Sequence, residues 1–204
     1  KKNYFVIRMG KIVSRPFPFK HKKFIDYPYS KFKSDFLDIF ICANSYFTVS
    51  SLTGLDSISY IFKRPILGIQ FPLQGVNILN HCTLITLPKF FSKSKSLFLK
   101  SSELSQIIQS EKLKNEFDLM SPKILKKYNL IMKGNTKNEI KYAGIDMLKK
   151  LKNSKIKSID QKNFWKQIID LNYNFKKLSS KKITTVKTNV ALSYYKKNRK
   201  YLDF

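Results

Sequence analysis

The sequence predicts an α/β fold in which helices flank a parallel sheet, and three observations support this prediction. A short β-rich run at 46–50 and a continuous apolar run at 66–71 enclose a helical pattern at 55–63. This strand–helix–strand order is the unit from which parallel sheets are built. The chain has 204 residues, of which 43% are hydrophobic, and this suffices for one large domain with a packed core.

The N-terminal segment predicts two short strands. Residues 4–9 form a β-rich run that ends at Gly10, and a loop rich in Lys, Pro and Phe follows at 11–23. A second strand covers 24–27 and ends before Pro28.

A largely buried helix is predicted at 35–44. Ser34 is a favourable N-cap residue, and Asp35 places an acid in the first turn. Apolar residues recur behind them at helical spacing, namely Phe36, Leu37, Phe40 and Ile41.

The central segment predicts a Rossmann-like βαβ unit. The strand at 46–50 leads through a polar turn at 51–54 into the helix at 55–63, whose apolar face carries Leu55, Ile58, Ile61 and Phe62. The run at 66–71 stands between two prolines, which is typical of a buried parallel strand.

The pattern weakens beyond Pro72, and 75–91 is interpreted as an irregular connection. Helices are expected at 102–116, from Ser121-Pro122 onward, and at 137–152, where Thr136 and Glu139 form a capping box.

A linker at 153–162 and two amphipathic helices at 162–178 and 185–201 are expected to complete the chain. We therefore divide it into a Rossmann-like domain at 1–152 and a helical C-terminal extension at 153–204.

The net charge of +27 favours anionic surroundings such as nucleotides, nucleic acid or an acidic membrane surface. The basic residues are 36 Lys and only 4 Arg, and Lys, Asn, Ile, Phe and Tyr are all abundant. An AT-rich genome gives the same bias, so the charge does not choose among these partners.

Cys42 and Cys82 are 40 residues apart, and neither His21 nor His81 has a partner at metal-ligand spacing. Two reduced thiols and a cytoplasmic location are expected, with no metal site. No run of 18 apolar residues indicates a membrane span.

The turn Ser50-Ser51-Leu52-Thr53-Gly54-Leu55 is the first candidate site, because it joins the carboxyl end of a strand to a helix N-terminus. Ligands of open α/β sheets bind at such ends, where unpaired N–H groups and small residues admit a phosphate. The alternative is that Ser51 or Thr53 only caps the helix and Gly54 relieves a tight turn.

Arg8, which precedes Gly10, is the second candidate, because a lone Arg ending a strand on the same sheet edge could bind a phosphate. Asp26 and Tyr27 could face the same cleft. A surface arginine and a loop pair are the alternatives.

Asp35 and Asp38 lie one helical turn apart, and a carboxylate there could bind guanine or a ribose hydroxyl. Asp35 is explained equally well by the helix dipole, whereas Asp38 on an apolar helix needs a partner or a ligand. No residue is assigned a catalytic role.

The block VIRMGK…FIDY…SDFLDI…TGL…RPI resembles a family of bacterial glycosyltransferases from surface-polysaccharide and lipopolysaccharide gene clusters, which are GT-B-like and distantly similar to fucosyltransferases and heptosyltransferases. Leu87-Pro88-Lys89 and Asn135-Thr136 with Glu139-Ile140 are similar to further elements of that family. Thr53 departs from the pattern, which more often has Ser, but keeps the hydroxyl.

The resemblance implies the C-terminal, nucleotide-sugar-binding half of a two-domain enzyme that needs no metal or other cofactor. The donor diphosphate would lie on Arg8, Gly10, Ser51, Thr53, Gly54 and Leu55, and the base and ribose, possibly of a GDP-sugar, on Asp26, Tyr27, Asp35 and Asp38. The family carries an H-x-R segment on a strand before Tyr4, so we expect the first strand of the sheet and the N-terminal acceptor domain to be missing.

The implied partners are a nucleotide sugar and a glycan or lipid-linked acceptor, with peripheral contact to the inner membrane and no nucleic acid. Two alternatives remain: a basic nucleic-acid-binding protein, and a non-catalytic remnant of a glycosyltransferase. The Lys-rich C-terminal segment could rest on a membrane or on single-stranded nucleic acid, or it could be a solvated helix face.

Overall fold

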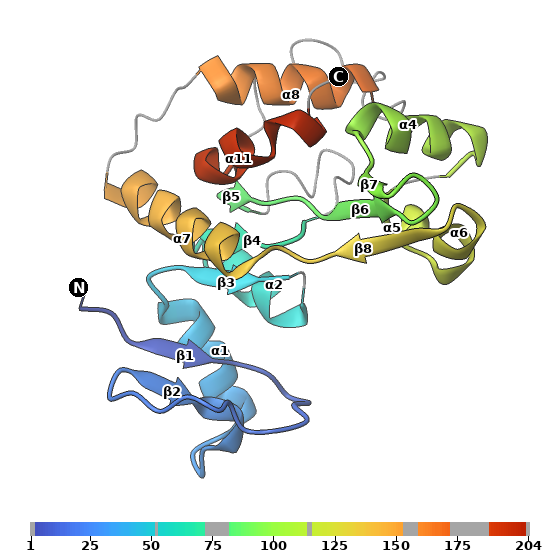
Figure 1. Cartoon of the computed structure of the whole chain (residues 1–204). Coiled ribbons are helices and arrows are strands. Elements are labelled where there is room, and N and C mark those ends of the chain that lie inside the picture. Colours follow the sequence, from blue (N-terminus) through green and yellow to red (C-terminus); the bar gives the residue numbers. More distant parts are fainter. Residues whose placement is uncertain are drawn as a thin grey trace.

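The computed structural model describes residues 3–51, 53–71, 82–113, 116–152, 159–171 and 188–202. The described chain has a mixed α/β fold in which helices flank a parallel sheet, as predicted (Figure 1). The four strands of this sheet are, in spatial order, β3 (Thr48–Ser50), β4 (Ile66–Gly68), β5 (Leu84–Ile85) and β9 (Asn189–Val190).

The core lies between this sheet and three helices: α7 (Lys137–Lys152), α8 (Ile159–Leu171) and α11 (Leu192–Leu202). Ile66 and Leu67 of β4 are fully buried, as the apolar run in the sequence predicts. The helices bury large side chains against the sheet, namely Met147, Phe164, Trp165, Tyr194 and Tyr195.

The C-terminal part differs from the expected helical extension, because β9 joins the sheet inside the predicted helix 185–201. The indole Nε1 of Trp165 in α8 donates to the Thr188 carbonyl oxygen at 3.0 Å. Residues 159–171 and 188–202 therefore share one core with β4 and β5. Most of the predicted linker, 153–158, and the predicted helical residues 172–187 lie outside the described chain.

A second, antiparallel sheet of three strands has the order β7 (Leu97–Phe98), β6 (Lys89–Ser92) and β8 (Leu130–Lys133). The expected irregular connection at 75–91 is thus wrong for its last part, which contains β5 and β6, while 72–81 lie outside the described chain. The helices α4 (Ser101–Ser110), α5 (Glu116–Leu119) and α6 (Pro122–Lys127) accompany this sheet.

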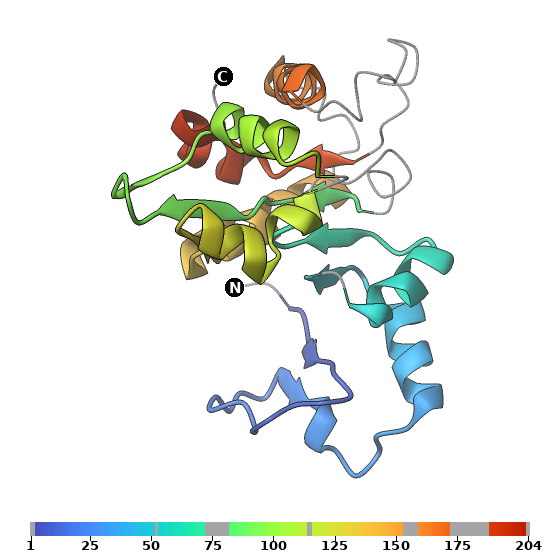
Figure 2. The ribbon, with the colours of Figure 1, turned by 90° about the vertical axis from the view of Figure 1, so that its right-hand side faces the viewer.

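The N-terminal lobe, residues 3–44, contains the parallel strands β1 (Val6–Arg8) and β2 (Phe24–Asp26), a 3-10 turn at Tyr27–Tyr29, and α1 (Asp35–Asn44). The β1–β2 pair forms a sheet of its own and lies at one end of the molecule, beyond β3 (Figure 2).

Helix α1 has the predicted bounds, and Ser34 caps it, since the Leu37 amide donates to Ser34 Oγ at 3.2 Å. The prediction that α1 is largely buried is wrong. The side chain of Phe36 is 71% exposed and that of Phe40 is 51% exposed. These apolar residues therefore have no cover within the described chain.

Helix α2 (Gly54–Ile61) turns a polar face to the sheet instead of the predicted apolar one. Asp56 and Ser59 are buried, whereas Ile61 is 71% exposed. The cause is local hydrogen bonding to β3, because Ser59 Oγ lies 2.7 Å from Thr48 Oγ1 and Ser50 Oγ donates to Asp56 Oδ2 at 3.1 Å.

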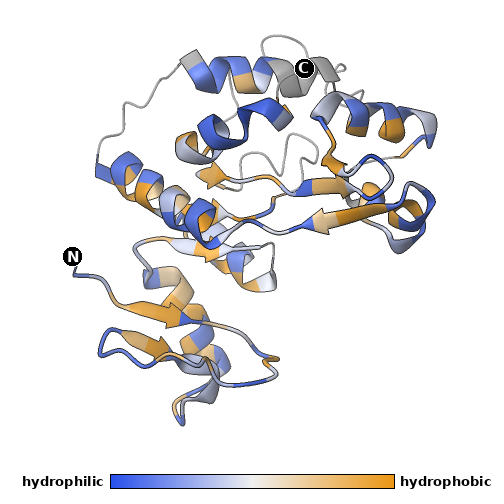
Figure 3. Cartoon of the chain, viewed as in Figure 1, coloured by the Kyte–Doolittle hydropathy of each residue, from blue (hydrophilic) through white to orange (hydrophobic). Residues whose placement is uncertain are grey.

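Most of the exposed large apolar side chains lie between Phe5 and Phe62, and apolar colour marks both β1 and β2 (Figure 3). Parallel strands are normally buried on both faces. Among the described residues, no helix is long and apolar enough to cross a membrane.

Candidate functional site

The turn between β3 and α2 lies at the carboxyl edge of the parallel sheet, as the sequence predicts. Ser51, Thr53 and Gly54 are exposed, and Leu55 is half-buried. Thr53 is the N-cap residue of α2, and its side chain makes no capping hydrogen bond. Leu52 lies outside the described chain. The start of α2 is therefore accessible to a ligand.

Gly54 leaves free space at this helix start. A Cβ atom built on Gly54 would meet no other atom within 4 Å. Its backbone can thus be approached closely, and the first N–H groups of a helix carry partial positive charge. This combination suits an anion such as a phosphate.

Asp56 follows two residues later but faces inward. Its side chain is buried beneath the turn, where Ser50 Oγ donates to it. Burial, followed by the charge of Asp56, raises the pKa of the Cys82 thiol to about 12. The carboxylate therefore points toward the core and leaves the exposed turn free for a ligand.

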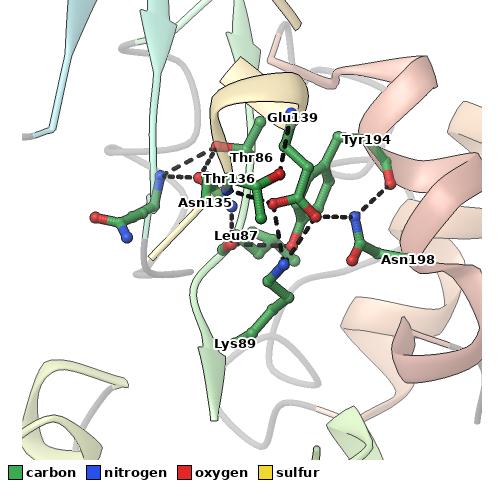
Figure 4. Close-up of polar contacts among 9 residues, drawn as sticks. Thr86, Leu87, Lys89, Asn135, Thr136, Glu139, Tyr194 and Asn198 are labelled. Atoms are coloured by element: carbon green, nitrogen blue, oxygen red, sulfur yellow. Dashed lines mark hydrogen bonds and ion pairs between the residues drawn. The ribbon is translucent and has the colours of Figure 1, made fainter. Parts of the chain in front are cut away.

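The carboxyl edge continues along β4 and β5, where Asn135 fixes the start of α7 to both strands (Figure 4). Asn135 Oδ1 accepts from Thr86 Oγ1 at 2.7 Å and from the Gln70 amide at 3.1 Å. Its Nδ2 donates to the Leu87 carbonyl oxygen at 3.2 Å. The N-terminus of α7 is thereby held at this edge of the sheet.

Glu139 lies at the centre of a buried polar network behind Asn135 (Figure 4). Lys89 Nζ lies 2.7 Å from Glu139 Oε1, the Thr136 amide donates to Oε2 at 2.7 Å, and Asn198 Nδ2 donates to Oε1 at 3.0 Å. Burial alone would raise the pKa of Glu139, but these donors outweigh it and lower the pKa to about 2. Glu139 is thus ionised and fully engaged.

The same network confirms the capping box, because the Glu139 amide also donates to Thr136 Oγ1 at 3.3 Å. Tyr194 of α11 closes it on one side, with its hydroxyl donating to the Leu87 carbonyl oxygen at 2.9 Å. Burial raises the pKa of that hydroxyl well above its usual range. This cluster explains itself as structural support for the carboxyl edge.

Arg8 and Asp26 lie together, but on the separate β1–β2 sheet. Arg8 Nη1 lies 3.1 Å from Asp26 Oδ1 and donates to the Arg15 carbonyl oxygen at 3.2 Å. Asp26 also accepts from the Phe17 amide at 2.7 Å. The expectation that Arg8 ends a strand of the same sheet as the turn is therefore wrong, since β1 pairs with β2 and β3 pairs with β4.

Gly10 adopts φ +148°, a conformation that side chains other than glycine rarely take. Tyr27 is buried, and its hydroxyl accepts from the Ser34 amide and donates to the Ser34 carbonyl oxygen, both at 3.0 Å. These contacts tie the end of β2 to the start of α1 and give Tyr27 a structural role.

Asp35 is exposed in the first turn of α1, as a helix-dipole acid would be. Asp38 differs, because its Oδ1 atom is buried and has no hydrogen-bond partner among the described residues. Burial, followed by the charge of Asp38, raises the pKa of Cys42. An orphaned buried carboxylate oxygen is the kind of atom that a ligand donor would satisfy.

The structure thus brings together the turn residues, and separately Arg8 with Asp26. Sequence reasoning gave no role to Gln70 or Thr86 at the carboxyl edge. Their position two residues after β4 and one residue after β5 was the available signal, because parallel strands end at one edge. Among the described residues there is no group of three or more His, Cys, Asp or Glu side chains that could hold a metal ion.

No family model matches this chain, and comparison with curated proteins and with solved structures finds no similar protein.

Proposed function

We propose that this chain is the donor-binding half of a glycosyltransferase of the GT-B type, which transfers a sugar from a nucleoside diphosphate to a surface-polysaccharide or lipopolysaccharide acceptor. The observation that carries the proposal is the exposed Ser51-to-Leu55 turn, with open space around Gly54, at the start of α2. The order of motifs along the chain supports it further.

The turn suits a departing diphosphate for electrostatic reasons. As the glycosidic bond breaks, negative charge grows on the leaving phosphate, and fixed N–H donors aimed at that charge lower the barrier. The backbone at Thr53, Gly54 and Leu55 supplies such donors, and the macrodipole of α2 adds partial positive charge. In this proposal the site needs no metal.

The remaining candidate residues take secondary roles. Asp38 accepts hydrogen bonds from the base or the ribose, and its unpartnered Oδ1 atom supports this role. Arg8 reaches a phosphate only by exchanging its contact with Asp26 for one with the ligand. The acceptor, and the base that activates its hydroxyl, belong to an N-terminal domain of the enzyme. A cytoplasmic location near the inner membrane follows from this acceptor.

The test is thermal stabilisation of the chain by GDP, UDP, ADP, CMP and their sugar conjugates. A ligand that binds only the folded state stabilises it by about 2.7 kcal/mol at 100 times its dissociation constant. We expect a nucleoside diphosphate to raise the melting temperature. We expect Gly54→Val to abolish the rise without unfolding the chain, because the added side chain fills open space.

The matched control is Gly144→Ala, a glycine substitution in α7 away from the turn, which should keep the rise. Loss of the response in Asp38→Asn for GDP alone would assign guanine recognition to Asp38. The absence of any shift from a folded sample would overturn the proposal. Salt-sensitive binding to DNA or RNA in that sample would favour the basic nucleic-acid-binding alternative.

A further inference from the structure

We propose that one further β-strand lies between β1 and β3, parallel to both, and that a segment of the same polypeptide outside residues 1–204 supplies it. The space between β1 and β3 is called the strand seat below. The inference is independent of the proposed function, because it rests on strand edges and on uncovered apolar side chains.

Two strand edges border the seat. Within the described chain, β1 pairs only with β2 and β3 pairs only with β4, so each has one edge without a neighbouring strand. Both pairings are parallel. An unpaired strand edge offers N–H and C=O groups to another strand.

β1 and β3 begin side by side and run in the same direction. Tyr4 lies two residues before β1 and Tyr46 two residues before β3, and their rings stack with centroids 5.5 Å apart. Figure 1 shows the two strands running the same way from that point. A single parallel strand could therefore pair with both edges at once.

The register identifies which backbone groups face the seat. In a parallel pair, alternate residues bond to the neighbouring strand. The Thr48 amide donates to the Pro65 carbonyl oxygen and the Ser50 carbonyl oxygen accepts from Ile69, so Val49 between them points away from β4. By the same alternation, Val6 bonds to Lys23 beside β2, and Ile7 points away from β2. The backbones of Ile7 and Val49 thus border the seat.

The side chains that flank the seat are apolar and uncovered. Val6 is 58% exposed and Val49 is 52% exposed, and Phe5 and Tyr46 next to these strands are also exposed. A two-stranded sheet is marginally stable by itself in water. Uncovered apolar area of this kind is typical of a permanent contact, which favours a strand from the same polypeptide over a transient partner.

The order of strands gives the same answer. With the seat filled, the sheet would read β2-β1-seat-β3-β4-β5-β9, so the chain would build outward on both sides of the seat. In doubly wound sheets ligands bind at the carboxyl ends of the strands where the order reverses. The Ser51-to-Leu55 turn follows β3 at that place, so the added strand would form the second wall of the candidate site.

The test compares amide hydrogen exchange in the 204-residue chain and in the natural polypeptide with its flanking residues. We expect the Ile7 and Val49 amides to exchange at least about tenfold more slowly in the longer polypeptide, while Leu67 of β4, already paired on both sides, stays unchanged.

Val49→Pro sharpens the test, because it removes only the N–H group that faces the seat. It should leave the melting temperature of the 204-residue chain close to that of Val49→Ala, and should destabilise the longer polypeptide more than Val49→Ala does.

Equal exchange of Ile7 and Val49 in both polypeptides would overturn the proposal, and so would a natural polypeptide that has no flanking segment. Protection of these two amides that rises with the concentration of the 204-residue chain would instead assign the seat to a second copy.

Discussion

The ammonium group of Lys89 and the carboxylate of Glu139 lie 2.7 Å apart, and the two side chains are only 11% and 1% exposed. The pair joins β6 of the antiparallel sheet to the first turn of α7, which rests on the parallel sheet. It therefore connects the two sheets of the described chain, close to the carboxyl edge.

We predict that Glu139→Gln destabilises the protein by about 3–5 kcal/mol, because it leaves the Lys89 charge buried without its counterion. Urea unfolding followed by circular dichroism measures the effect. Glu103→Gln is the control, since Glu103 pairs with the exposed Lys95 at 2.5 Å and such pairs contribute less than about 1 kcal/mol. Equal losses in the two variants would contradict a stabilising role for the buried pair.

Stability should fall in acid because of the same residue. The pKa of Glu139 is lowered from 4.5 to about 2 by its donors. Its contribution is therefore complete above the unfolded-state pKa and is lost as the pH falls from about 5 toward 2, since the unfolded chain binds the proton first. Urea unfolding from pH 7 to pH 3 measures this, and Glu139→Gln should have a flatter profile. Parallel profiles would show that other groups cause the acid loss.

Local physics explains what could be predicted from the sequence. The cap at Ser34, the box formed by Thr136 and Glu139, and Pro122 at the first position of α6 each act within one turn of helix. The strand–turn–helix junction of the candidate site also lies within ten residues. These features need no knowledge of distant contacts.

Distant contacts explain the rest. β9 has two residues and exists because it pairs with β5, more than one hundred positions earlier in the chain, so its window reads as helix. Helix α2 presents Asp56 and Ser59 to the sheet because Ser50 and Thr48 bond to them. The partners of Arg8 and Lys89 were equally invisible, since each comes from another segment.

Gln161 should stabilise the edge of the main sheet. Its side-chain amide accepts from the Val190 amide at 2.9 Å and donates to the Val190 carbonyl oxygen at 2.7 Å, as a neighbouring strand would. We predict that Gln161→Leu costs about 1–3 kcal/mol, because buried backbone groups lose their partners. Urea unfolding measures the cost, with Gln106→Leu on the exposed face of α4 as the control. A loss no larger than that of the control would refute this role.

Two glycines should respond to alanine with opposite signs. A Cβ on Gly68 would lie 2.9 Å from Phe71 Cδ2 and 3.0 Å from Cys82 Sγ, whereas one on Gly144 in α7 would meet nothing within 4 Å apart from its own helix. Gly68→Ala should cost about 1–3 kcal/mol through overpacking of the core at β4. Gly144→Ala should add about 0.5–1 kcal/mol, because alanine loses less backbone entropy in a helix. Each kcal/mol shifts the melting temperature by about 2–4 °C in a domain of this size, so calorimetry resolves both. A melting temperature that changes in the same direction in both variants would mean that the packing around Gly68 yields to the added methyl group.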